Sequence, residues 1–107
     1  MAHAASLIAD QQVRNRGTIG GSLAHGDPAS DLPVVLLAAA GSVTARGPGG
    51  ERTIAVPDLC QGFMSTAVAA DEVITEVRVP KLSGYGWGYE KFNRRSEDWA
   101  MVGVCAL

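Results

Sequence analysis

Residues 12–33 read QVRNRGTIGGSLAHGDPASDLP, and the middle of this stretch, Thr18-Ile19-Gly20-Gly21-Ser22, decides how the chain is interpreted. We expect a loop over residues 15–22, because its three glycines tolerate backbone angles that other residues avoid. Adjacent glycines let backbone N–H groups approach an anion closely, and hydroxyl groups at both ends of the run can donate to phosphate oxygens. Five such residues alone are more typical of an ordinary tight turn. They match neither the P-loop nor the G-x-G-x-x-G pattern, and no strand precedes them, which argues against a Rossmann fold.

Two helices are expected around this loop. The segment from Ala4 to Val13 is rich in alanine and places its larger apolar side chains at nearly helical spacing. From Asp27 to Ala40 the pattern is again helical, and Pro33 is tolerated only in the first turn of a helix. The second helix is therefore expected to begin at Ser30 or at the aspartate that follows it.

Strand-like segments follow in the rest of the chain. Ser42–Arg46 and Arg52–Val56 flank a turn rich in glycine and proline, which predicts a β-hairpin. Residues 72–79 alternate and are rich in β-branched side chains, so they are expected to form another strand. We also expect one irregular helical turn at 57–62, a linker at 81–84, a strand at 86–94 and an apolar run at 101–107. This order of elements indicates an α+β fold, a small antiparallel sheet flanked by helices.

Composition narrows the class of protein. The chain has 107 residues, 47% hydrophobic and 19% charged, with a formal net charge of -2. This balance is not that of a phosphate-backbone binder, so no nucleic acid partner is expected. The longest apolar stretch, Val34–Ala40, is much shorter than the ~20 residues of a transmembrane segment. Cys60 and Cys105 fit no metal or redox spacing, and we expect buried reduced thiols, no metal site and a cytoplasmic location.

Residues 12–33 as a whole resemble the FAD-binding subunits of molybdenum hydroxylases, the family of the carbon monoxide dehydrogenase medium subunit and the FAD domain of xanthine dehydrogenase. The resemblance continues in order through Arg46–Arg52 (RGPGGER), Asp71–Pro80 (DEVITEVRVP) and Tyr89–Ala100 (YEKFNRRSEDWA), and so covers nearly the whole chain. It implies that residues 1–80 are the second lobe of a vanillyl-alcohol-oxidase-type FAD-binding domain. Residues 81–107 would then begin the C-terminal domain, cut short here.

The resemblance also implies which residues bind FAD. The Thr18–Ser22 run would hold the pyrophosphate with backbone amides and hydroxyl groups. Asp31 would accept a hydrogen bond from a polar group of the cofactor, such as a ribose hydroxyl. Ile8 would lie against the adenine, and Ile74 would offer backbone contacts at the same end. Lys91 would approach the flavin ring or the chain attached to it.

Each of these residues also has a structural explanation. Asp31 could cap the helix that follows, Ile8 and Ile74 could be core residues, and Lys91 could be a solvated charge on a strand. His25 has no nucleophile or second ligand spaced to act with it, so a structural role is favoured. The aromatic residues near the C-terminus could stack on a flavin, although an apolar anchor for the adjoining domain is the stronger interpretation: these are Trp87, Tyr89, Phe92 and Trp99.

In such a family, electrons pass from a molybdenum cofactor through iron–sulfur clusters to FAD and leave to an external acceptor. The resemblance therefore implies FAD as cofactor, a molybdenum-cofactor large subunit and an iron–sulfur small subunit as partners, and no catalytic residue in this chain. The family's earlier glycine-rich loop is absent from the sequence, so we expect a fragment that is inactive alone. The alternatives are a flavoenzyme of the same fold that oxidises its own substrate directly, or a non-catalytic assembly fragment.

Overall fold

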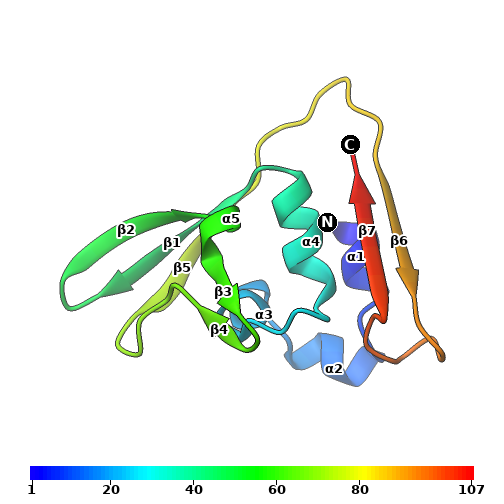
Figure 1. Ribbon diagram of the computed structural model, residues 1–107, viewed down its shortest axis with the longest axis horizontal. Helices are drawn as coiled ribbons and strands as arrows, with labels where there is room; N and C mark the ends of the chain where they lie inside the picture. Colours follow the sequence, from blue (N-terminus) through cyan, green and yellow to red (C-terminus); the bar gives the residue numbers. More distant parts are fainter.

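The computed structural model describes all 107 residues and places a central helix, α4, between two groups of antiparallel strands (Figure 1). A three-stranded sheet lies on one side of α4, and a hairpin formed by the last two strands lies on the other. This is the α+β class, with small antiparallel sheets and flanking helices, that the sequence predicts. None of the helices is long enough and apolar enough to cross a membrane.

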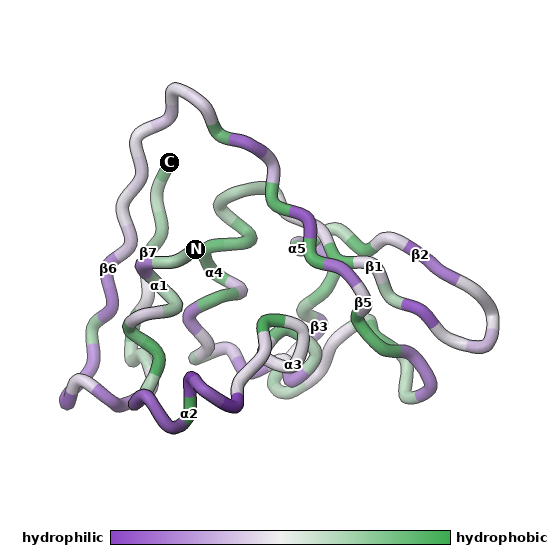
Figure 2. Tube along the Cα trace, turned by 180° about the vertical axis from the view of Figure 1, so that it is seen from behind, coloured by the Kyte–Doolittle hydropathy of each residue, from purple (hydrophilic) through white to green (hydrophobic).

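The single N-terminal helix predicted over Ala4–Val13 is wrong, because two short helices form there. α1 spans Ala2–Ser6 and α2 spans Gln11–Arg16. The side chain of Asp10 accepts a hydrogen bond from Val13 N at 2.8 Å and thereby caps the start of α2. α2 buries none of its residues and is largely hydrophilic (Figure 2). A local cap therefore interrupts a segment whose apolar spacing looks continuous.

The loop predicted over residues 15–22 is also wrong, because Thr18 starts a helix. α3 spans Ile19–His25, and Thr18 Oγ1 accepts a hydrogen bond from Gly21 N at 3.0 Å. Glycine is a poor helix former, but the helix packs on strand β5 (Val73–Arg78). It ends at Gly26, whose φ of 68° is the left-handed conformation common after a helix C-terminus.

The second predicted helix is confirmed. α4 spans Asp31–Ala38, with Ser30 as its N-cap and Pro33 in its first turn, where proline costs no hydrogen bond. It ends two residues earlier than predicted, and Ala40 follows with a φ of 51°. On the sheet side of α4, the main core comprises Leu23, Leu36, Val43, Ala45, Ile54, Val56 and Leu59.

The predicted hairpin is confirmed and forms part of the three-stranded sheet. β1 (Ser42–Gly47) pairs antiparallel with β2 (Gly50–Ala55) and on its other edge with β5, so the strand order is β2-β1-β5. The helical turn predicted at 57–62 is shorter, because α5 covers only Val56–Leu59. The chain then forms an unpredicted two-stranded ribbon of β3 (Cys60–Gly62) and β4 (Ser65–Thr66).

The C-terminal segments form a separate hairpin. β6 (Gly88–Phe92) pairs antiparallel with β7 (Val102–Ala106) and packs against α1 and α4 through a cluster of Ala4, Val35 and Tyr89. Of the four aromatic residues considered as an apolar anchor, only Tyr89 is buried, whereas the other three are 63–65% exposed. Both cysteines are free as expected, but the predicted burial is wrong for both, because Cys60 is exposed and Cys105 is only half-buried. The division of the chain near residue 80 stays a prediction.

Candidate functional site

A cavity of about 1030 Å³ opens between the N-terminal helices and the loop that follows β6. Residues from both ends of the chain line it, from Met1 to Leu32 and from Lys91 to Trp99. Seven of the predicted site residues are among them: Ile8, Thr18, Ile19, Gly21, Ser22, Asp31 and Lys91. The structure thus brings together residues that the sequence separates widely.

Gly20 and Ile74 do not line this cavity. They lie next to each other behind it, and a Cβ placed on Gly20 would be 3.7 Å from the backbone oxygen of Ile74 and 3.8 Å from its Cβ. Ile74 is half-buried and packs against the main core. Gly20 therefore lies at the packing contact between α3 and β5, where a Cβ would still stand at ordinary van der Waals distance from Ile74.

The first turn of α3 forms a polar end of the cavity. Gly21 N donates to Thr18 Oγ1 at 3.0 Å, and Ser22 N donates to the backbone oxygen of Thr18 at 3.0 Å. Helix geometry leaves the amides of Ile19 and Gly20 without an intrahelical acceptor. A Cβ on Gly21 would stand 2.9 Å from Thr18 Oγ1, so a side chain here would force the cap to shift. The glycine pair was expected to offer two backbone amides to an anion. The amide of Gly20 has no intrahelical acceptor, but the amide of Gly21 is already hydrogen-bonded to Thr18.

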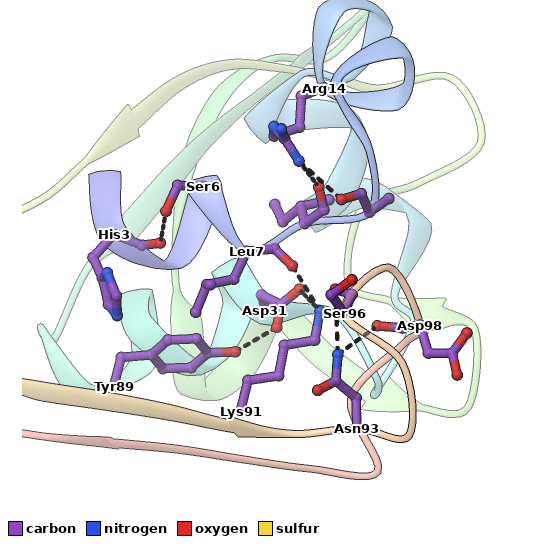
Figure 3. Close-up of polar contacts among 12 residues, drawn as sticks. His3, Ser6, Leu7, Arg14, Asp31, Tyr89, Lys91, Asn93, Ser96 and Asp98 are labelled. Atoms are coloured by element: carbon purple, nitrogen blue, oxygen red, sulfur yellow. Dashed lines mark hydrogen bonds and ion pairs between the residues drawn. The ribbon is translucent and has the colours of Figure 1, made fainter.

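A buried ion pair forms the wall of the cavity at the start of α4 (Figure 3). Lys91 Nζ lies 3.0 Å from Asp31 Oδ2, and both side chains are only 5% exposed. The hydroxyl of Tyr89 donates to Asp31 Oδ1. Burial, and then the hydrogen bond to the carboxylate, raise the pKa of Tyr89 far above its usual value. Asp31 and Lys91, predicted to contact the cofactor separately, thus contact each other.

Tyr89 was missed as a site residue by the sequence analysis. It stands two residues before Lys91 on β6, so the two side chains share one face of the strand. This alternation of side chains along the strand was the only sequence signal that could have linked Tyr89 to Lys91. It does not show that the shared face meets the buried carboxylate of Asp31, which is 58 residues away in the chain.

Lys91 also contacts the turn between α1 and α2. Its Nζ donates to the backbone oxygen of Leu7 at 3.0 Å (Figure 3). Within this turn, Ile8 lines an apolar part of the cavity together with Ala5 and Val13. The cavity therefore has a polar part at α3 and an apolar part at the α1–α2 turn.

Other ionisable residues do not form a catalytic or metal-binding cluster. His25 lines the cavity, but no group of three or more histidine, cysteine or acidic residues is placed to bind a metal ion. Arg14 and Arg16 add positive charge to the lining, and Glu97 and Asp98 add negative charge. The arrangement can bind a ligand that joins an anionic group to an apolar one.

The chain belongs to the family of FAD-binding domains of molybdopterin dehydrogenases, since the family model described as "FAD binding domain in molybdopterin dehydrogenase" matches residues 1–82. It is similar to the carbon monoxide dehydrogenase medium chain of Hydrogenophaga pseudoflava, with 46% identity over all of this chain and 37% of that protein. It is also similar to the nicotine 6-hydroxylase medium subunit of Paenarthrobacter nicotinovorans, with 50% identity over all of this chain and 38% of that protein. The chain thus spans little more than a third of these relatives.

Solved structures agree with this assignment. A carbon monoxide dehydrogenase from Hydrogenophaga pseudoflava that lacks the Mo-pyranopterin moiety superposes with a TM-score of 0.91 and 48% identity, over 95% of this chain and 36% of that one. Quinoline 2-oxidoreductase from Pseudomonas putida 86 superposes with a TM-score of 0.90 and 31% identity, over 96% of this chain and 36% of that one. The resemblance found in the sequence is therefore confirmed at the level of family and fold.

Proposed function

We propose that this chain binds FAD in the cavity beside α3, as part of the electron-transfer component of a molybdenum hydroxylase. The observation that supports this most directly is the cavity itself, because it gathers seven of the nine residues that the family resemblance implies. The family match supplies the identity of the ligand.

The residues of the cavity suit the parts of FAD. The free amide of Ile19 and the hydroxyl groups of Thr18 and Ser22, all of which line the cavity, would bind the pyrophosphate. Thr18 Oγ1 accepts from Gly21 N, so its own hydrogen remains available for a phosphate oxygen. Arg16 lines the same cavity and has no protein hydrogen-bond or ion-pair partner, which leaves its charge for an anion. The apolar lining beside Ile8 would receive a ring of the cofactor.

In this proposal, electrons pass from iron–sulfur clusters through FAD to an external acceptor. FAD would supply the redox chemistry, while the chain binds and orients it. The partners would be a molybdenum-cofactor large subunit and an iron–sulfur small subunit, and the complex would lie in the cytoplasm. The relatives support this assembly by their names, which describe medium chains or subunits of dehydrogenases and hydroxylases.

Titration of the purified apoprotein with FAD tests the proposal, with quenching of flavin fluorescence as the readout. Ser22→Tyr is expected to abolish binding, because Ser22 is only half-buried and lines the cavity, so a large side chain there fills the site without disturbing the core. The control is Ser83→Tyr, at an exposed position outside the cavity, which is expected to bind FAD like the wild type. A wild-type protein that binds no FAD, or equal binding by both variants, would contradict the proposal.

A further inference from the structure

Tyr89 stands behind the wall of the cavity and is hydrogen-bonded to that wall through Asp31. Its side chain is buried and does not line the cavity, whereas Asp31 and Lys91 both do. The ring packs in the cluster with Ala4 and Val35, and the hydroxyl donates to Asp31 Oδ1 (Figure 3). An effect of this hydroxyl on a ligand must therefore pass through the carboxylate of Asp31.

The carboxylate of Asp31 is held by two donors from the same face of β6. Tyr89 donates to Oδ1, and Lys91 donates to Oδ2 at 3.0 Å. Because the side chains of Asp31 and Lys91 are both buried, water cannot replace a partner that is removed. The two donors thus fix the orientation of the carboxylate, and the carboxylate in turn fixes the ammonium group of Lys91.

This ammonium group keeps one hydrogen for a ligand. A lysine side chain has three N–H donors, and two of those of Lys91 are used by the backbone oxygen of Leu7 and by Asp31 Oδ2, each at 3.0 Å (Figure 3). The third has no acceptor in the protein, although Lys91 lines the cavity. A ligand atom that accepts from it gains a charge-assisted hydrogen bond.

On the basis of the proposed FAD site, we propose that Tyr89 is a positioning residue for FAD binding. Its hydroxyl engages one carboxylate oxygen of Asp31, so that Lys91 pairs with the other and directs its remaining N–H into the cavity. Without the hydroxyl, both oxygens of Asp31 are open to Lys91, and the ammonium group can turn toward them and away from the ligand. The proposal concerns the orientation of this group, whichever atom of the cofactor accepts from it.

The first test measures the FAD affinity of Tyr89→Phe by quenching of flavin fluorescence, expressed per folded molecule. The folded fraction comes from urea unfolding curves, because the variant is also less stable. We expect FAD to bind about tenfold more weakly, the scale of one hydrogen bond from a charged group. Ile54→Val is the control for stability, since it removes a buried methylene from the main core outside the cavity. It is expected to bind FAD like the wild type.

A double-mutant cycle then tests whether Tyr89 acts through Lys91. Lys91→Gln removes the ammonium group but keeps a donor, and it is also expected to weaken binding about tenfold. In that background, Tyr89→Phe should add less than about twofold, because no ammonium group remains to be positioned. The comparison of Tyr89→Phe with Ile54→Val decides the question even if Lys91→Gln does not fold.

Three outcomes would overturn the proposal alone: unchanged FAD affinity in Tyr89→Phe, equal weakening by Ile54→Val, or additive effects of Tyr89→Phe and Lys91→Gln. A wild type that binds no FAD would overturn the proposed function, and this proposal with it.

Discussion

At the scale of single residues, the hydroxyl of Tyr89 completes the buried ion pair of Asp31 and Lys91. It donates to one carboxylate oxygen while Lys91 takes the other. Tyr89→Phe keeps the ring in its cluster with Ala4 and Val35 but removes the hydrogen bond to a charged group. We expect a loss of about 1.5–3 kcal/mol in the free energy of unfolding, measured with urea.

Tyr85→Phe is the matched control for this variant. The side chain of Tyr85 is 63% exposed and makes no side-chain hydrogen bond, so the same change there is expected to alter stability by less than about 0.5 kcal/mol. Equal effects of the two substitutions would show that the contact between Tyr89 and Asp31 contributes nothing to folding.

The carboxyl group of Glu72 makes the free energy of unfolding depend on pH. Arg52 donates to both of its carboxylate oxygens at 2.8 Å, and Ala69 N donates to Oε2 at 2.8 Å. The hydrogen bonds from Arg52, followed by that from Ala69, lower the pKa of Glu72 from 4.5 to about 2. A carboxyl group whose pKa is lower in the folded state stabilises the fold above its unfolded pKa, and this contribution disappears as the pH falls through the folded value.

The free energy of unfolding is therefore expected to decline between pH 4.5 and about 2, in part because of this residue. Glu72→Gln should flatten that part of the profile and lower stability at neutral pH. Denaturant titrations at a series of pH values measure both effects. Glu51→Gln is a suitable control, because the side chain of Glu51 is 53% exposed and its distance to Arg46 is 3.7 Å. A decline of unchanged slope in Glu72→Gln would refute the assignment.

At the scale of elements, the two glycines of α3 differ in what an added side chain would meet. A Cβ on Gly21 would lie 2.9 Å from Thr18 Oγ1, whereas a Cβ on Gly20 would meet Ile74 at ordinary contact distances of 3.7–3.8 Å. Gly21→Ala is expected to lose the cap and about 1 kcal/mol. Gly20→Ala is expected to be neutral or to stabilise by up to about 1 kcal/mol, since alanine favours the helix. Thermal unfolding of the two variants measures this difference, and a reversed order would contradict it.

A comparison of α3 with α4 shows which elements could be predicted from the sequence and which could not. The start of α4 was predictable, because Pro33 is tolerated only in the first turn of a helix, although the side chain of the N-cap residue Ser30 makes no capping hydrogen bond. α3 was not, because local propensity disfavours adjacent glycines and the compensating contact with Ile74 comes from a strand 54 residues later. Ala9 is a similar case, since its left-handed backbone depends on the side chain of Arg14. Local signals thus predicted α4 and the β1–β2 hairpin, but they missed the helix starts after Asp10 and Thr18, although the caps there are also local.

For the candidate site too, the sequence indicated individual residues but not the tertiary contacts between them. Resemblance to the family indicated residues of the cavity such as Thr18, Asp31 and Lys91, although nothing in their spacing requires them to meet. The chain between them forms the three-stranded sheet and a long connection before β6 returns to α1 and α4 (Figure 1). That return is a tertiary property, so periodicity could not indicate that Asp31 and Lys91 form an ion pair.

At the scale of the whole molecule, the cavity lies where the two ends of the chain meet, so a bound ligand would contact both. Its lining comes from residues 1–32 and 91–99, while the tip of the β1–β2 hairpin lies outside it. A ligand that binds only the folded state stabilises it, by about 2.7 kcal/mol at a hundredfold excess over its Kd. Local opening of the segments that the ligand contacts becomes correspondingly rarer.

Hydrogen–deuterium exchange measured with and without FAD tests this view of the molecule. We expect slower amide exchange in the α1–α2 turn, the first turn of α3 and residues 97–99, because the ligand must leave before any of them can open. The hairpin turn at residues 47–50 is the internal control and is expected to exchange at an unchanged rate, since it lies outside this cavity. Protection restricted to the N-terminal segments would mean that residues 97–99 do not enclose the cofactor. The ligand would then contact the cavity only on the side formed by the N-terminal segments.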